Sequence, residues 1–315
     1  MKYVLYYLLK LPLIGRCFAK VFEKFKVVTS AKGWRQNQIA YDVSNRMIMN
    51  ILEKGMLDLD EVLTEVEEYQ NEGISLVTLG GDVTIIPHKD FYSSVNDGEL
   101  ERYDIPADMY YSNLDGTWND DDDDKWGEIE EADLLPEIGI SRMSFTSNST
   151  QETLIHKTLS YQCNPISHEL RDIVLGSEKA DDVTYGGDYL ELIIGYREDN
   201  DYATTGIPED YHFNRIYAEH GTWSKANFMN AINYGSQSVH HVGHANPNYI
   251  AGMEINYITD DNFSSLNGID NNFTYMYSHG CSCAAFDKVS IMERMTTINN
   301  FCFAIIGNSR EGFYL

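Results

Sequence analysis

Two segments of the sequence end an apolar stretch on a glycine and then present a side chain able to do nucleophilic chemistry. Residues 238–245 place His244 directly after a glycine, and residues 275–283 place Cys281 in the same position. If both segments are neighbouring parallel strands, the two side chains emerge at one edge of the sheet. An imidazole beside a thiol favours the thiolate and can protonate the departing amine when an amide is attacked. The pattern therefore predicts Cys281 as a nucleophile and His244 as its base, with each glycine allowing the sharp turn that exposes the side chain.

The elements that must position this pair follow from the alternation of apolar runs and helical spacing. Apolar runs predict strands over residues 75–79, 137–140, 173–175, 238–242, 273–277 and 301–306. Capping residues and stop signals predict helices from Asp58 to Gly73, from Ser149 to Pro165 and from Ser224 to Gly235, and a further helix over 289–298. Strand-helix-strand units predict an α/β fold with a mostly parallel sheet covered by helices on both faces.

Three parts of the chain are expected. The N-terminal apolar segment, residues 1–26, is compatible with either a weak signal peptide or an amphipathic helix packed on the domain. Its apolar run from Tyr3 to Ile14 is too short for a comfortable transmembrane helix, so no transmembrane anchoring is expected. The remaining chain divides into an N-terminal α/β subdomain, 27–148, and a catalytic α/β subdomain, 149–315.

Composition restricts the partners of this protein. The 315 residues include 49 acidic and 23 basic ones, which gives a formal net charge of −26. A phosphate backbone would be repelled by this field, so nucleic acid is excluded as a partner, and cations or basic peptides fit better. The chain has five cysteines, an odd number too small for a disulfide-built fold of this length, so at least one thiol is expected to be free.

The His-then-Cys order on successive strands resembles the clan of caspases, legumains and gingipains, and the motifs are most similar to gingipain-like cysteine peptidases. The similar segments, in order along residues 74–315, are Leu79-Gly80-Gly81-Asp82, Ile86-Pro87, residues 108–116, residues 126–128 and 136–142, Val242-Gly243-His244, residues 281–287 and residues 304–310. The resemblance implies a caspase-hemoglobinase-like fold, with two stacked subdomains, and hydrolysis of peptide bonds in protein or peptide substrates. It also implies a secreted or cell-surface protein. Because members of this family usually continue with further domains, we expect Leu315 to end a piece of a longer protein.

The same resemblance implies further site residues. Glu178, at the end of the segment Ile173–Glu178, matches the third catalytic residue, a carboxylate that orients the histidine. The backbone N–H groups of Cys281 and Ala245 would form the oxyanion hole. Asp188 matches, across a one-residue gap, the acid that selects a basic side chain before the cut bond.

Catalysis is expected to need no cofactor, but the acidic loop 119–124 suggests a structural calcium ion. Asn119, Asp121, Asp123 and Glu128 offer the hard oxygen ligands that calcium prefers, although their order does not match an EF-hand. Acidic runs are also commonly solvated loops. Gingipain-like proteins often hold structural calcium, which favours the metal.

Two alternatives to an active peptidase are open. Ala245 and Ala284 stand where the family usually has glycine, so the chain could be an impaired relative that only binds. Alternatively, His240, His241, His244, Cys281 and Cys283 could ligate zinc, although adjacent strand residues point to opposite faces. Cys283 is either a second thiol able to pair with the nucleophile or a small packing residue.

Overall fold

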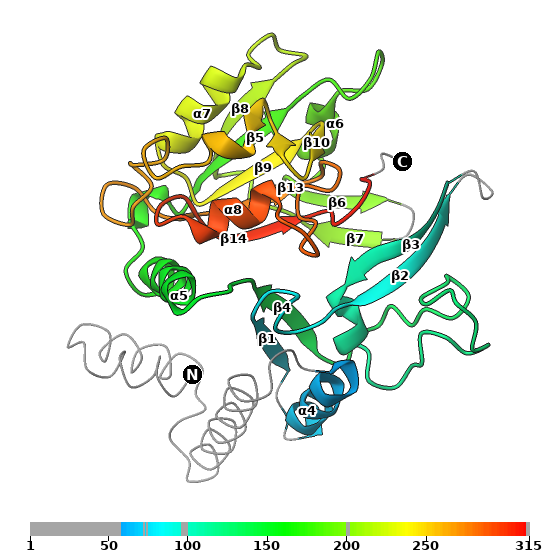
Figure 1. Cartoon of the computed structure of the whole chain (residues 1–315). Helices are drawn as coiled ribbons and strands as arrows, with labels where there is room; N and C mark the ends of the chain where they lie inside the picture. Colours follow the sequence, from blue (N-terminus) through cyan, green and yellow to red (C-terminus); the bar gives the residue numbers. More distant parts are fainter. Residues whose placement is uncertain (1–57, 72, 74, 96–99, 200–201, 313–315) are drawn as a thin grey trace. The chain divides into compact units, whose positions relative to one another are not determined.

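The computed structural model describes residues 58–71, 73, 75–95, 100–199 and 202–312, and the predicted N-terminal segment 1–26 lies outside them. The chain divides into two compact units, Met1–Asn148 and Ser149–Leu315. Figure 1 labels their helices and strands.

The first unit combines one helix with small sheets around an aromatic core. Its described elements are α4 (Leu59–Asn71), β1 (Leu76–Gly80), β2 (Lys89–Val95), β3 (Leu100–Ala107), the 3-10 helix η1 (Asp108–Tyr111) and β4 (Gly139–Met143). β1 pairs with β4 in parallel, and β2 with β3 in an antiparallel hairpin. Val62 and Val66 of α4 pack with Leu79 and Tyr111, as the helical spacing predicts.

A buried arginine connects the segments of this unit that resemble the gingipain-like family. Arg142 donates two hydrogen bonds to the Asp108 carboxylate, at 2.7 and 2.6 Å. It also donates to the backbone carbonyls of Gly81, Ile86 and Pro87. A charged side chain with only 6% exposure is stable here because all these acceptors satisfy its guanidinium.

The second unit is built on a parallel sheet. Its described elements are α5 (Asn148–Cys163), η2 (Ser167–Glu169), β5 (Asp172–Ser177), α6 (Gly186–Glu191), β6 (Tyr196–Asp199), β7 (Tyr202–Thr205), β8 (His212–Tyr217), α7 (Lys225–Asn233), β9 (Ser238–Val242), β10 (Ala245–Asn246), β11 (Tyr249–Ile250), β12 (Met253–Glu254), η3 (Ile255–Tyr257), β13 (Thr274–Ser278), α8 (Ile291–Thr297) and β14 (Cys302–Gly307). Among these, five strands form one sheet in the order β14-β13-β9-β5-β8. Every pairing in it is parallel.

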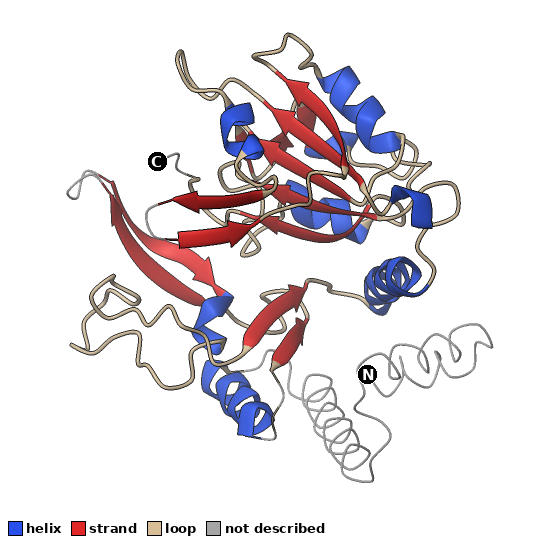
Figure 2. Cartoon of the chain, turned by 180° about the vertical axis from the view of Figure 1, so that it is seen from behind, coloured by secondary structure: helices blue, strands red, loops and turns tan. Residues whose placement is uncertain are grey.

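Alternating side chains of this sheet pack into two separate cores. Val174, Val239 and Met276 face the cluster that includes Phe228 of α7 and Met292 of α8. Ile173 and Leu175 face the opposite cluster, which includes residues of α6. Helices therefore cover both faces of the sheet, as the views from opposite sides show (Figures 1 and 2). The predicted α/β class with a mainly parallel, doubly covered sheet is confirmed.

Candidate active site

The loops that carry the predicted nucleophile and base meet at the carboxyl edge of this sheet. β9 and β13 are adjacent and parallel, and the chain leaves them at Gly243 and Gly280, just before His244 and Cys281. A Cβ built on Gly280 would lie 2.4 Å from Ala245 Cβ and 3.3 Å from the Gly243 carbonyl oxygen. The two loops are therefore in direct contact, with the His244 side chain exposed and Cys281 half-buried.

Both glycines are needed for close packing rather than for backbone freedom. Neither Gly243 nor Gly280 has a positive φ. A Cβ on Gly243 would meet the Glu178 side chain, 2.4 Å from Oε2 and 2.8 Å from Cβ. The sequence-based explanation, that each glycine permits a sharp turn, is therefore replaced by close contact with a neighbouring loop.

Glu178 follows β5 and reaches the loop of His244 by its carboxylate. Oε2 accepts a hydrogen bond from the backbone N–H of His244 at 2.9 Å and lies 3.5 Å from Nε2 of His241. The side chain is 13% exposed. The sequence predicts that Glu178 lies beside the His244 ring, whereas the carboxylate contacts the His244 backbone and lies near the His241 ring. The carboxylate thus fixes a negative charge at the base of the His244 loop.

The sulfur of Cys281 lies next to the C-terminal segment. Cys281 is a free cysteine. The Gly312 N–H donates to Sγ at 3.4 Å, and the thiol can donate to the Gly312 carbonyl at 3.7 Å. The following residue, Ser282, donates its N–H to the Arg310 carbonyl at 2.6 Å. Residues 310–312 therefore hold the nucleophile loop in place.

Arg310 is itself fixed by an ion pair with Asp287. Its guanidinium donates to the two carboxylate oxygens at 2.9 and 3.0 Å. Burial would raise the pKa of Asp287, but the hydrogen bonds and charge of Arg310 outweigh it and hold the pKa below its usual range. Asp287 therefore stays ionised, and this pair stabilises the loop that begins at Cys281.

The backbone N–H groups on either side of Cys281 are hydrogen-bonded, unlike that of Cys281 itself among the described residues. The Gly280 N–H donates to Ser278 Oγ at 3.1 Å, and the Ser282 N–H is also paired. In the described part of the chain, no acceptor is found for the N–H of Cys281. Ala245 begins β10 and does not have a positive φ, so the departure from glycine produces no backbone strain there.

Cys283 is a packing residue of this loop. It is fully buried and free, and its thiol donates to the Gly280 carbonyl at 3.2 Å. Burial raises the pKa of its thiol. A protonated, buried thiol is poorly suited to attack the neighbouring sulfur.

The two adjacent histidines of β9 lie on opposite faces of the sheet, which argues against the zinc alternative. His240 lies near the rings of Tyr275 and Tyr277, and burial lowers its pKa to about 4. His241 instead lies near the rings of Phe228 and Trp223. Among the described residues, these histidines and the two thiols do not form a group close enough to hold one ion.

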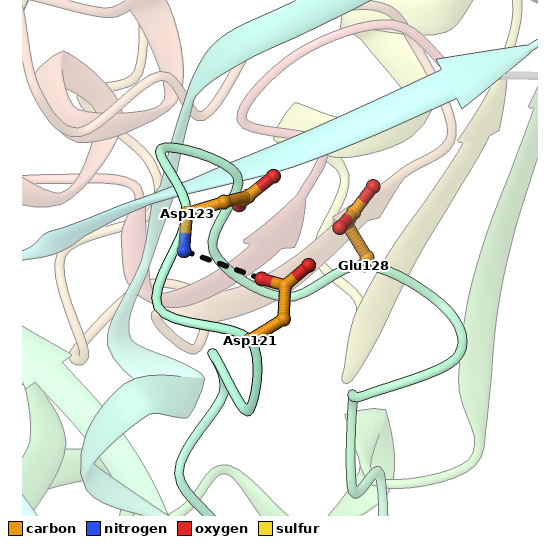
Figure 3. A group of neighbouring side chains, drawn as sticks. All are labelled: Asp121, Asp123 and Glu128. Carbon is orange, nitrogen blue, oxygen red and sulfur yellow. Dashed lines mark hydrogen bonds between the residues drawn. The ribbon is translucent and has the colours of Figure 1, made fainter.

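Three of the four predicted calcium ligands converge in one loop of the first unit (Figure 3). Ligand oxygens of Asp121, Asp123 and Glu128 lie within 4.8 Å of one another. The amide of Asn119 instead pairs with the backbone of Asp123, at 3.0 and 3.1 Å. Lys125 Nζ lies 3.7 Å from Glu128 Oε1 and so partly compensates the charge.

Asp188 lies in the first turn of α6, which begins beside Glu178. The N–H of Gly186 donates to the Glu178 carbonyl at 3.2 Å, and Asp188 itself is exposed. A second carboxylate, Glu219, packs on the backbone of Gly187, where a Cβ would lie 1.6 Å from Oε1. This corner of the second unit is therefore acidic.

A contact that was not predicted from the sequence joins His241 and Ser278 beneath the two loops. His241 Nδ1 lies 3.0 Å from Ser278 Oγ, and both side chains are buried. A signal for this contact exists, because each residue stands two positions before the glycine that ends its strand. Equal spacing on adjacent parallel strands places them opposite each other, as the register confirms.

Comparison with known proteins identifies related sequences and folds. The family model of peptidase family C25 matches residues 34–314. The structure is similar to the crystal structure of the Arg-specific cysteine proteinase gingipain R (RgpB), with a TM-score of 0.57, 18% identity, and coverage of 82% of this chain and 54% of that one. It is also similar to the complex of Porphyromonas gingivalis RgpB pro- and mature domains, with a TM-score of 0.55, 16% identity, and coverage of 81% and 55%. This chain thus spans about half the length of the solved chains that it matches. No curated protein sequence matches it significantly.

Proposed function

The chain belongs to peptidase family C25, and we propose that it is a cysteine endopeptidase that cleaves peptide bonds through a thioester intermediate. The observation that carries this proposal is the contact of the Cys281 and His244 loops at the carboxyl edge of the sheet. Family membership supports the reaction class. Alanine at position 245, where the family usually has glycine, is compatible with the proposal because that residue has no positive φ.

In the proposed reaction, the Cys281 thiolate attacks the carbonyl carbon of the scissile amide. The oxyanion receives hydrogen bonds from the N–H groups of Cys281 and Ala245. The C–N bond then breaks as His244 protonates the departing amine. The acyl group stays on the Cys281 sulfur as a thioester. His244 then takes a proton from water as the water attacks the thioester, the C–S bond breaks, and the acid leaves while the Cys281 thiolate is restored beside the protonated His244. Glu178 orients the loop of His244 by accepting a hydrogen bond from the backbone N–H of His244.

A peptide library tests this proposal. The purified chain should generate new peptide N-termini, detectable by mass spectrometry, and prior alkylation of thiols should abolish them. A chain that unfolds cooperatively, and so is folded, yet cleaves no member of the library would contradict the proposal.

We further propose a preference for arginine or lysine before the cut bond, selected by Asp188. The exposed Asp188 carboxylate, with the half-buried Glu219 nearby, supports it, because a fixed charge favours an opposite charge on the substrate. Asp188→Asn is expected to lower kcat/KM for an arginine reporter about 10- to 100-fold, as for the loss of one charged hydrogen bond, and to leave a leucine reporter unaffected. Glu198→Gln, on exposed β6, removes one negative charge elsewhere and serves as control. Equal cleavage of acidic, apolar and basic reporters by the wild type would contradict a preference for arginine or lysine.

We propose that the acidic loop of the first unit binds calcium through Asp121, Asp123 and Glu128. Their close carboxylates repel one another without a cation. Calcium at about 100 times its Kd is expected to raise the free energy of unfolding by about 2.7 kcal/mol, measured as an upward shift of the unfolding transition against chelator. Asp121→Asn should remove the shift, and Asp124→Asn, in the same acidic run, should keep it. An identical transition with calcium and with chelator would contradict calcium binding.

Protein or peptide substrates are the partners that this proposal requires. Among the described residues, no helix has both the length and the apolar character needed to cross a bilayer. Secretion or cell-surface location is proposed from the family resemblance, and detection of the chain in culture medium tests it.

A further inference from the structure

A buried chain of polar contacts connects the strand end that carries Glu178 with the strand end that carries Cys281. Its central member, His241, has no solvent exposure. On one side, Nε2 lies 3.5 Å from Glu178 Oε2. On the other, Nδ1 lies 3.0 Å from Ser278 Oγ, which accepts the N–H of Gly280 at 3.1 Å. The contacts thus cross three adjacent strands, β5, β9 and β13.

The directions of these contacts select one tautomer of His241. A carboxylate only accepts hydrogen bonds, so the nitrogen facing Glu178 must carry the proton. Nδ1 is then an acceptor for the Ser278 hydroxyl, whose oxygen remains free to accept the Gly280 amide. Each group in this arrangement matches its neighbour in donor or acceptor type, although Nε2 and the Glu178 carboxylate do not have hydrogen-bond geometry.

The contact between His241 and Glu178 is close but is not a hydrogen bond. In the described part of the chain, the buried Nε2 has no partner with hydrogen-bond geometry. Leaving a buried donor unpaired is energetically unfavourable. A shift of the Glu178 carboxylate by about 0.5 Å would bring it within hydrogen-bond distance. A small movement of the carboxylate would therefore pair it with this nitrogen.

We propose that His241 is a positioning residue for the proposed peptidase reaction, on which this inference rests. Its ring holds the Glu178 carboxylate beneath the His244 backbone and, through Ser278, holds the amide that precedes Cys281. A displacement at any of these contacts moves the acid, the base loop and the nucleophile loop relative to one another. Misplacement of a reacting group by about 1 Å can cost about 100-fold in rate.

The test is the rate at which a biotinylated peptidyl acyloxymethyl ketone labels Cys281. His241→Phe keeps a ring of similar size between Phe228 and Trp223 but removes both polar contacts. It is expected to lower kinact about 10- to 100-fold with KI changed less than about threefold, per folded protein. His241→Gln, which can still donate to Glu178, should recover a large part of kinact. His240→Phe makes the same change at the neighbouring position on the opposite face and should leave both constants within about twofold.

A double variant separates positioning from simple packing. If Ser278 acts in part through His241, the Ser278→Ala change should slow the wild type more than it slows His241→Phe, because the Gly280 contact is lost in both backgrounds. Wild-type kinact in His241→Phe, or failure of His241→Gln to recover any of the loss, would overturn the role of His241 while labelling of the wild type still supports the peptidase. A folded wild type that is not labelled would overturn the proposed function and this inference with it.

Discussion

Replacement of Cys281 by alanine is expected to lower kcat/KM for peptide hydrolysis at least about 10⁴-fold, because the acyl group then has no sulfur to bind. The measurement is the initial rate with a reporter peptide that the wild type cleaves, at equal concentrations of folded protein. Alanine fits the half-buried site of Cys281 without new contacts, so the unfolding transition should change little.

Cys283→Ala is the matched control, since it removes the same atom two residues away. The Cys283 thiol is buried, has a raised pKa and donates to the Gly280 carbonyl. We expect its kcat/KM to stay within about fivefold of the wild type, because loss of a packing thiol shifts the loop only slightly. Full activity in Cys281→Ala together with loss of activity in Cys283→Ala would show that Cys283, and not Cys281, is the nucleophile.

The second large effect is expected at Lys157, in the core of the second unit. This fully buried lysine of α5 donates hydrogen bonds to the carbonyls of Thr296, Ile298 and Asn300, which follow or end α8. Lys157→Met keeps the length of the side chain but leaves these carbonyls unpaired. At about 1–3 kcal/mol for each buried group left unpaired, the free energy of unfolding at pH 10 should fall by about 3 kcal/mol or more, measured by urea denaturation.

The same lysine should make stability depend on pH. Burial lowers its pKa to about 7, whereas the pKa in the unfolded chain is close to 10.5. Between these values the unfolded chain binds a proton that the folded chain does not. The contribution of Lys157 to the free energy of unfolding therefore rises with pH through this window, by at most about 1.4 kcal/mol per pH unit. This contribution is lost as the pH falls to about 7. The difference in stability between wild type and Lys157→Met should grow with pH from 7 to 10; parallel pH curves would contradict it.

Much of the sheet follows from the sequence because four of its five strands contain apolar or aromatic residues in short runs or in alternation. The strands β5, β9, β13 and β14 overlap the predicted ranges, and Ser224 caps α7 by accepting the N–H of Asn227. Strand order could be inferred only in part. The pairing of β9 with β13 agrees with the idea that His244 and Cys281 leave neighbouring strands. Tertiary packing brings β5 to the other side of β9, and no local pattern encodes this.

The missed elements lack a local signal for physical reasons. β8 is an edge strand whose first residues alternate between exposed and half-buried, so it has no apolar run. α6 has six residues and begins at two glycines, which disfavour helix in isolation. The acidic loop shows the same limit, because the sequence groups Asn119 with the carboxylates while its amide binds the backbone instead. Side-chain direction in an irregular loop depends on contacts that spacing does not determine.

The contacts of Glu178 could not be foreseen because they depend on its neighbours across the sheet. A carboxylate after β5 can reach either a backbone amide or a ring, and the sequence does not indicate which one is nearer. Packing of Glu178 on Gly243 turns its oxygen toward the His244 N–H. The sequence identifies the residues of the candidate site better than their contacts.

The most direct test of the central claim, a Cys281–His244 pair, is mass-spectrometric mapping of the residue labelled by a biotinylated peptidyl acyloxymethyl ketone. We predict a single label on Cys281 in the folded wild type, persistence of the label in Cys283→Ala, and loss of labelling in Cys281→Ala and His244→Ala. A folded wild type that stays unlabelled, or that carries the label on another residue, would contradict it.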